Sequence, residues 1–376
     1  MMEVRLDDLA AVVEQTTDPA GFPHAARVER NVLVYDAAQA RATSSSDRAA
    51  LAAELVRALT DGPGIVVFEG AFPDLAVVDR VTEVFDAIIA EEAATGAAAG
   101  DHFAPPGANS RVWNALEKLA VRDPEAFVSY YANDVIALVS SAWLGPGYQL
   151  TSQVNVVRPG GRAQEPHRDY HLGFLSDEQA ARYPDHVHAL SPVLTLQGAV
   201  AHTDMPLESG PTLYLPFSHQ YLPGYLAWRR DDVKAYFAQH HVQLPLHKGD
   251  AGFFNPAVLH GAGSNVSRDI QRMANLLQVS SAFGRAMEQV DRARVVSAVY
   301  PVLRRGGLRG DELEAAVAAA AEGYPFPTNL DLDQPVDGPT PLSQAELVRH
   351  ALAEGWEPAA LDATLDAHAA RRRTTS

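Results

Sequence analysis

The chain has 376 residues, of which 47 are acidic and 30 basic, so its formal net charge is −17, and 47% of its residues are apolar. This length and composition predict a globular protein with one large domain or two modest ones. The absence of cysteine excludes disulfides, zinc fingers, iron–sulfur clusters and thiol nucleophiles. The acidic balance argues against nucleic-acid binding, no apolar run reaches the length of a membrane span, and the acidic start over residues 1–8 is unlike a signal peptide, so we expect a soluble, cytoplasmic protein.

The first 145 residues are expected to be mainly helical, with one strand. A run of small polar residues, Ser44 to Asp47, is typical of a helix N-cap, and Gly62, Pro63 and Gly64 end the helix that follows. Apolar residues at helical spacing indicate further helices, and a β-branched run indicates a short strand. The predicted elements are helices over 48–59, 74–94 and 124–143 and a strand over 65–68.

After residue 145 the pattern changes to short apolar or alternating runs separated by glycine and proline. Such runs predict an antiparallel sandwich or barrel, the class that includes jelly rolls. One helix interrupts the strands, and beyond residue 283 the chain is helical again except for a loop rich in proline and aspartate. The predicted strands are 149–157, 193–202, 212–215, 242–246, 251–254 and 273–281, the helix is 225–240 and the loop is 324–342.

His167 and Asp169 form the densest candidate for a metal site, because histidine and carboxylate ligands must serve where cysteine is absent. On a strand, residues i and i+2 point to the same face, about 6.6 Å apart. On a helix the same spacing would separate them by about 200°. Pro166 favours an extended chain here. We therefore predict that His167 and Asp169 converge on one point and that Arg168 faces away.

His260 is the candidate for a third ligand, because it ends an apolar run just before a glycine-rich turn. Two imidazoles and one carboxylate form the facial triad of non-haem Fe(II) oxygenases. Arg272 opens the next strand, and we predict a hairpin that places it beside the strand of His260. There its guanidinium would bind the far carboxylate of a 2-oxo acid that chelates the metal.

Two nearby residues compete for these roles. His171 lies two residues after Asp169, but three ligands from five consecutive residues would crowd one side of a metal ion, so we expect His171 to lie behind the ligands or to contact the substrate. Arg268 is an alternative to Arg272, yet it stands beside Asp269 in a polar turn, where we expect it to be exposed.

Three motifs stand out: His167-Arg168-Asp169, the run from His260 to Asn265, and Arg272 followed by Ala274. Together they resemble the phytanoyl-CoA dioxygenase family of Fe(II)- and 2-oxoglutarate-dependent oxygenases, which have a double-stranded β-helix (jelly-roll) core. The segments 64–68, 158–160 and 210–219 support the resemblance, although Phe217 stands where the family has a turn glycine. The resemblance covers roughly residues 60–285.

The resemblance implies a role for each candidate residue. His167, Asp169 and His260 would bind Fe(II), Arg272 would bind the 2-oxoglutarate C5 carboxylate, and Gln197 and Gln164 would border the co-substrate. With O2, the enzyme would hydroxylate a small molecule by hydrogen abstraction and release succinate and CO2. Because Asp169 is present, halogenation is not expected.

The resemblance also implies the fold, an α+β protein whose mainly β core is a cupin-like jelly roll. Residues 1–285 would form this domain together with N-terminal helices, and residues 286–376 would form a C-terminal helical extension packed on or near the core. We expect the loop 324–342 to cover the mouth of the site.

The substrate class is only partly bounded by the sequence. Only three lysines occur, which argues against a coenzyme A thioester, whose phosphates favour a basic patch. The candidate substrates that remain are amino acids, sugars and secondary-metabolite scaffolds. One alternative function is a cupin-like metal-binding jelly-roll protein, either an isomerase or a sugar-binding module, in which Arg272 is structural. Another is a non-catalytic scaffold whose helical tail binds a partner.

Overall fold

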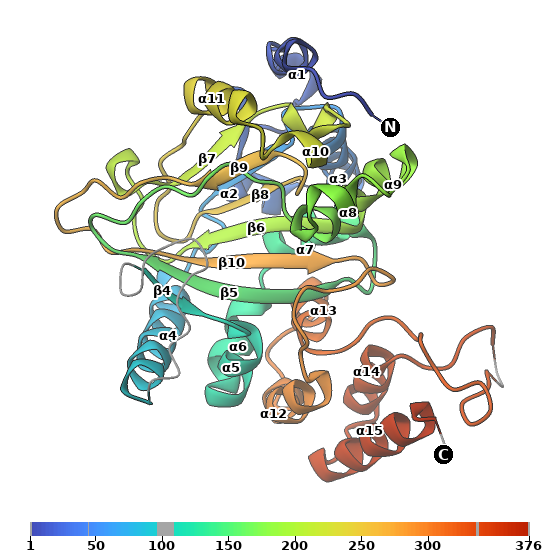
Figure 1. Ribbon diagram of the computed structural model, residues 1–376. Helices are drawn as coiled ribbons and strands as arrows, with labels where there is room; N and C mark the ends of the chain where they lie inside the picture. Colours follow the sequence, from blue (N-terminus) through green and yellow to red (C-terminus); the bar gives the residue numbers. More distant parts are fainter. Residues whose placement is uncertain (1, 44, 96–108, 336–337, 375–376) are drawn as a thin grey trace.

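The computed structural model describes residues 2–43, 45–95, 109–335 and 338–374 of an α+β protein (Figure 1). One sheet has eight strands and a smaller one has two. The strands are β1 (Arg27–Glu29), β2 (Val32–Asp36), β3 (Ile65–Glu69), β4 (Asn109–Val112), β5 (Gln149–Val157), β6 (Thr195–Ala201), β7 (Thr212–Leu215), β8 (Ala251–Phe254), β9 (Leu259–Ala262) and β10 (Arg272–Ser280).

Helices precede and follow most of the strands in the sequence, and they pack around the sheets. They are α1 (Leu6–Val13), α2 (Ala37–Ala42), α3 (Ser45–Thr60), α4 (Leu75–Thr95), α5 (Ala115–Arg122), α6 (Pro124–Tyr131), α7 (Asp134–Leu144), α8 (Asp177–Ala180), α9 (Asp185–Leu190), α10 (Gly224–Ala227), α11 (Asp231–His240), α12 (Arg292–Arg304), α13 (Asp311–Ala320), α14 (Gln344–Glu354) and α15 (Pro358–Arg372). Within the described residues, no helix combines the length and the apolar sequence needed to cross a membrane.

The large sheet has the strand order β1-β2-β3-β8-β6-β10-β5-β4, in which only β2 and β3 are parallel. Helices α4, α5 and α12 lie on one side of it, and the antiparallel pair β7–β9 lies on the other (Figure 1). Because successive side chains of a strand point to opposite faces, alternate residues of β5 and β10 enter the helical core, among them Val154 and Leu277. The other residues of β5 and β10 point to the opposite face, toward the small sheet.

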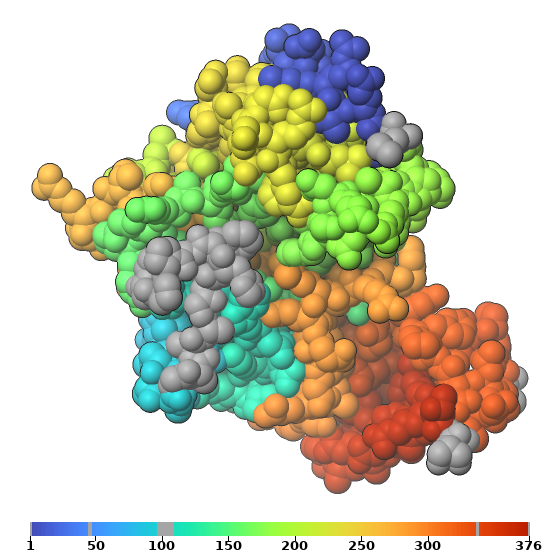
Figure 2. Space-filling model, in the orientation of Figure 1, coloured from blue at the N-terminus to red at the C-terminus, as the bar shows by residue number. Residues whose placement is uncertain are grey.

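The C-terminal helices continue this core. Val295, Val299 and Tyr300 of α12 belong to the same hydrophobic cluster as Leu277 of β10, and α15 joins it through Leu361. Figure 2 shows the last helices in red at the lower right of the molecule, far from α1 in blue at the top.

The segment before residue 145 contains more strands than expected. The expectation of one strand there is wrong, since β1, β2 and β4 accompany β3. The apolar run Val32–Tyr35 carried the signal for β2. The single helix expected over 124–143 is also wrong, because the side chain of Asn133 accepts hydrogen bonds from the amides of Val135 and Ile136 and so begins a new helix.

Two further expectations after residue 145 also need correction. The helix predicted over 225–240 is divided into α10 and α11. The strand predicted over 242–246 is extended chain that forms two isolated bridges, Tyr214 with Val242 and Met205 with Leu246.

The hairpin between His260 and Arg272 is not formed. β9, which carries His260, pairs with β7, whereas β10, which begins at Arg272, lies in the large sheet between β5 and β6. The chain between them crosses from one sheet to the other. Arg272 therefore faces His260 across the space between the sheets.

His202, which follows β6, is a buried neutral base within the helical layer. Its Nδ1 lies 2.8 Å from Oγ1 of Thr82, and its Nε2 lies 2.9 Å from the hydroxyl oxygen of Tyr130. Burial lowers the pKa of His202 to about 3. The unfolded chain binds a proton here near pH 6.5, whereas the folded chain does not.

We therefore expect the free energy of unfolding to fall as the pH falls from about 6.5 toward 3, with His202 contributing up to about 1.4 kcal/mol per pH unit. The variant His202→Gln removes this contribution, so its stability should depend less on pH than that of the wild type. Urea unfolding at several pH values measures the difference. Equal pH dependence in both proteins would contradict the expectation.

Candidate metal centre

Three side chains from two segments that are distant in sequence meet between the two sheets. Nε2 of His167 lies 3.6 Å from one carboxylate oxygen of Asp169, and Nε2 of His260 lies 3.4 Å from the other. The three potential ligand atoms lie within 4.8 Å of one another, and in the part of the chain that the structure describes no other cluster of His, Asp or Glu does so. The predicted convergence of His167, Asp169 and His260 is thus present.

Backbone hydrogen bonds hold the two histidine segments side by side. The amide of His167 donates to the carbonyl of His260 at 2.9 Å, and the amide of His260 donates back at 3.1 Å. The amide of Asp169 donates to the carbonyl of Pro256 at 3.2 Å. The segment of His167 is therefore extended, as predicted, although it forms one bridge and not a longer strand.

A strained turn follows Asp169. Tyr170 has φ 67° and ψ 151°, and His171 has φ 40°, which are backbone conformations that residues other than glycine rarely adopt. Such conformations cost about 1–3 kcal/mol each and persist where the surrounding structure imposes them. His171 turns away with its Nδ1 3.4 Å from Oγ of Ser191, and it does not line the cavity of the triad.

Arg168 faces away from the triad, as predicted, and anchors the segment. Its buried guanidinium donates to the carbonyl oxygens of Ser218 and Tyr221, the latter at 3.1 Å. The fit is tight, since a β-carbon at Gly224 would lie 1.9 Å from Cζ of Arg168.

The turn at Phe217 and Ser218 ties both ligand segments together. Phe217 has φ 66°, so the turn keeps a left-handed backbone without a glycine. Oγ of Ser218 accepts a hydrogen bond from the amide of Leu259, the residue before His260, at 2.8 Å. The carbonyl oxygen of Ser218 accepts a hydrogen bond from Arg168.

Hydrogen bonds fix the tautomers of both histidines. Nδ1 of His167 lies 2.9 Å from the carbonyl oxygen of Glu165, and Nδ1 of His260 lies 2.9 Å from that of Val258. Because a carbonyl only accepts, each Nδ1 carries a proton, and in the neutral imidazole this leaves the lone pair on Nε2, which faces the centre.

The protonation states suit a divalent cation. Burial lowers the pKa of His167, which favours the neutral imidazole. Burial alone would raise the pKa of Asp169, but the neighbouring His167 and His260 and a hydrogen bond from Gln197 together lower it to about 2. Two neutral imidazoles and one ionised carboxylate are the donor set of a facial-triad iron site, so these residues fit Fe(II).

A cavity of about 400 Å³ adjoins the triad. Its floor is the inward face of the large sheet. The floor residues follow the strand alternation, namely Gln153 and Asn155 of β5, Gln197, Ala199 and Ala201 of β6, and Arg272, Ala274, Leu276 and Gln278 of β10. The small alanine side chains among these residues leave room for the cavity.

Arg272 contributes a buried positive charge to this cavity. Nη1 donates to the carbonyl of Ser209 at 3.4 Å, and no carboxylate of the described residues lies within 4 Å of it. Burial lowers the pKa of Arg272 to about 10, so the group stays charged at neutral pH. A buried cation without an anionic neighbour is costly, and an anionic ligand would offset that cost.

The two glutamines predicted at the site both line the cavity. The side-chain amide of Gln197 donates to the carboxylate of Asp169, so this residue contacts the triad directly. Oε1 of Gln164 accepts from the amide of Ala262 at 3.0 Å and holds the end of β9. Arg268 is exposed in its loop, as expected.

The described residues of the loop 324–342 do not line this cavity. Tyr324, Phe326 and Pro327 instead line a neighbouring cavity that shares Met287 with it, so the expectation that this loop covers the mouth of the site stays a prediction. The loop leaves α13 and returns to α14 on the helical side of the large sheet (Figure 1).

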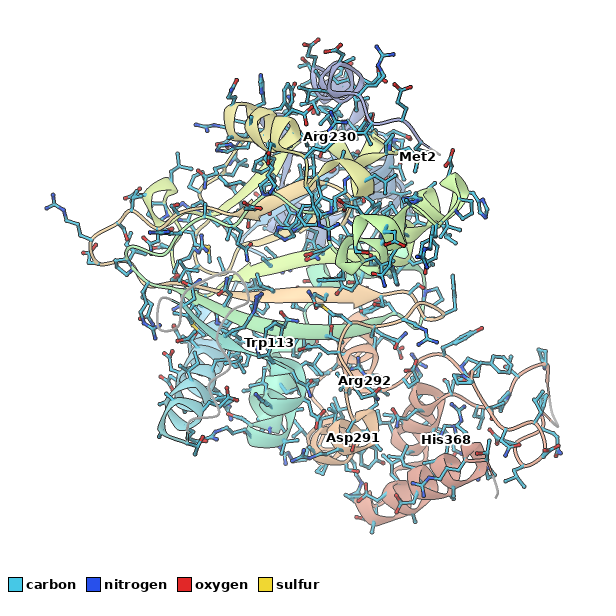
Figure 3. The ribbon with its side chains drawn as sticks, in the orientation of Figure 1. Met2, Trp113, Arg230, Asp291, Arg292 and His368 are labelled. Carbon is cyan, nitrogen blue, oxygen red and sulfur yellow. The ribbon has the colours of Figure 1, made fainter. Side chains whose placement is uncertain are left out.

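A group of polar and aromatic residues that lines the cavity was missed from the sequence. We call this group the polar wall, and it combines Arg111 and Trp113 with Gln153, Asn155 and Gln278 of the floor. The guanidinium of Arg111 lies 4.8 Å from the ring centre of Trp113, which Figure 3 labels beside the large sheet. The alternation of Gln153 and Asn155 in β5 was a usable signal, but Arg111 could not be placed because β4 was not predicted.

These features define a non-haem metal centre of the facial-triad type, with a cavity and a fixed cation beside it. The family model for phytanoyl-CoA dioxygenase (PhyH) matches residues 60–274, more than half of the chain. The chain belongs to this family of Fe(II)- and 2-oxoglutarate-dependent dioxygenases, and it contains the His-Asp-His triad.

Solved structures with a similar chain path include enzymes of nogalamycin biosynthesis. The non-haem α-ketoglutarate-dependent carbocyclase SnoK has a TM-score of 0.45 and 20% identity, over 73% of this chain and 96% of that one. The epimerase SnoN, in complex with Fe3+, α-ketoglutarate and nogalamycin RO, has a TM-score of 0.42 and 19% identity, over 64% and 85%. AviO1 from Streptomyces viridochromogenes Tue57 has a TM-score of 0.44 and 16% identity, over 65% and 99%. No curated protein sequence matches the chain.

Replacing Gln197 with leucine should weaken Fe(II) binding about 10- to 100-fold, because Asp169 loses a hydrogen bond that orients its carboxylate. Anaerobic titration with Fe(II) measures the affinity. Gln278→Leu is the matched control, since Gln278 lines the same cavity without a hydrogen bond to the triad. An equal loss in both variants, or no loss in Gln197→Leu, would contradict the assignment.

Proposed function

We propose that this enzyme hydroxylates a small-molecule substrate, with His167, Asp169 and His260 holding Fe(II) and Arg272 holding the far carboxylate of 2-oxoglutarate. One observation carries the proposal: the triad and a buried arginine without a carboxylate neighbour line the same cavity. In this triad the Nδ1 atoms of both histidines are hydrogen-bonded to backbone carbonyls. When bound at this triad, Fe(II) together with 2-oxoglutarate and O2 supplies the oxidising chemistry, in which 2-oxoglutarate becomes succinate and CO2.

The residues around the triad position the reactants. The planar guanidinium of Arg272 suits a bidentate carboxylate, which orients a dianionic co-substrate lengthwise in the cavity. Gln197 keeps the carboxylate of Asp169 in place, and Gln164 holds the end of β9 beside it. Because Asp169 occupies a ligand position, none is left for a halide, which favours hydroxylation over halogenation.

The polar wall is proposed to bind the substrate. Oδ1 of Asn155 is buried and accepts no hydrogen bond from the described residues, so it can accept one from a hydroxyl or amine. Apolar side chains such as Phe254 and Leu246 close the opposite side and exclude water. A cupin-like protein without oxygenase activity would leave the charge of Arg272 without a ligand.

We also propose that the sheets form the double-stranded β-helix expected from the sequence. In support, β8, β6, β10 and β5 are neighbours in the large sheet. Opposite them, the His167 segment bridges to β9, β9 pairs with β7, and β7 bridges to Val242, which gives a second layer of four extended segments. Residues 1–285 would then be the oxygenase domain and 286–376 a helical extension of its core.

Replacing Arg272 with alanine should weaken 2-oxoglutarate binding by about 30-fold or more, because a charge-assisted pair is lost, and should leave Fe(II) affinity within about twofold. The visible charge-transfer band that forms when 2-oxoglutarate is added anaerobically to the Fe(II)-loaded protein reports the binding.

Arg268→Ala is the control, since it removes an exposed arginine outside the cavity. Wild-type protein loaded with Fe(II) should also form succinate and CO2 from 2-oxoglutarate in air when ascorbate is present to take up the second oxidising equivalent. Unchanged 2-oxoglutarate affinity in Arg272→Ala would refute the role of this residue, and wild-type protein that never forms the band would refute the proposed function.

A further inference from the structure

A second cavity lies beside the first. It has a volume of about 690 Å³, and Met287 lines both cavities. Its walls come from the segment 282–290 that follows β10 and from residues 322–327 of the C-terminal part, with Arg292 at the start of α12 (Figure 3). These segments lie outside the part of the chain that the family model matches.

Aromatic side chains give this second cavity an apolar corner. The ring centres of Phe283 and Tyr324 are 6.4 Å apart, and those of Tyr324 and Phe326 are 5.7 Å apart, each pair at 65° between ring planes. Phe283 is 69% exposed, so most of its surface has no cover in the folded chain. Uncovered apolar surface next to an active-site cavity is typical of a ligand-binding surface.

One side chain, that of Met287, lines both cavities, and it is 40% exposed. Its sulfur lies 3.8 Å from Nε2 of Gln153, a residue of the polar wall. The unbranched methionine side chain changes conformation easily, so a ligand can pass it without moving the backbone.

A buried carboxylate lies at the boundary between the cavities. Oε1 of Glu288 accepts from the amide of Asn114 at 2.8 Å, and the side chain of Gln153 also contributes a hydrogen bond to this carboxylate. Glu288 lines the second cavity directly after Met287.

We propose that the substrate spans both cavities, with its reacting part beside the triad and an apolar, ring-bearing part against Phe283, Tyr324 and Phe326. The inference rests on the proposed function and narrows its substrate class to an elongated molecule with an apolar, ring-bearing end. A free amino acid or a single sugar would fill the first cavity and leave the aromatic corner uncovered. A secondary-metabolite scaffold with a ring system fits both.

The test uses the full chain with Fe(II) and 2-oxoglutarate under anaerobic conditions. The probe is octanol carrying a naphthalene ring at its far end, and octanol itself is the ring-free comparison. Naphthalene fluorescence measures binding of the probe, displacement measures octanol, and the charge-transfer band reports whether the alcohol end lies beside the metal centre.

We expect the ring-bearing probe to bind at least about tenfold more tightly than octanol and to shift the band. Phe283→Ala and Tyr324→Ala should each weaken the ring-bearing probe about three- to tenfold and octanol less than twofold. Tyr183→Ala, which removes an exposed aromatic residue that lines neither cavity, should change neither value. Because Phe283 is largely exposed, we expect Phe283→Ala to fold. This variant alone therefore tests the aromatic contact even if Tyr324→Ala fails to fold.

The inference is overturned if the ring gives no preference, if both variants keep the preference, or if the probe binds without shifting the band. A failure of the proposed function looks different. In that case no band forms with 2-oxoglutarate, while fluorescence still reports whether the aromatic residues bind the ring.

Discussion

The site depends on the reciprocal backbone hydrogen bonds between His167 and His260. They place the two imidazoles next to each other, with ring centres 4.5 Å apart and ring planes inclined by 51°, and the amide of Asp169 adds a third bond to the same neighbouring segment. On the other side of these segments, Arg168 donates to the carbonyl of Ser218, and the amide of Leu259 donates to Oγ of Ser218. The strained turn at Tyr170 shows that the surrounding structure imposes the geometry.

The second constraint is electrostatic. Asp169 gives the centre one negative charge, so bound Fe(II) would keep a net positive charge, and Arg272 places another positive charge at a distance in the same cavity. A dianion with a carboxylate at each end matches this arrangement. The alternating side chains of β5, β6 and β10 make room for it, because small residues such as Ala199 and Ala274 stand between the polar ones.

Local signals predicted the parts of the site but not their arrangement. The triad could be predicted from three local signals, namely the spacing of His167 and Asp169, the proline before them, and the end of an apolar run at His260. The hairpin from His260 to Arg272 was wrong because neighbours in sequence entered opposite sheets, and sheet pairing is a long-range property. Arg111 was missed because it lies on an edge strand with little hydrophobic signal. The cavity beside Phe283 joins segments whose proximity no periodicity reports.

The most direct test of the central claim is anomalous diffraction at the iron absorption edge, from crystals prepared anaerobically with Fe(II) and 2-oxoglutarate. The account predicts one peak between Nε2 of His167, Nε2 of His260 and the carboxylate of Asp169, with co-substrate density running from it toward Arg272. A peak elsewhere, no peak, or a co-substrate directed away from Arg272 would contradict it.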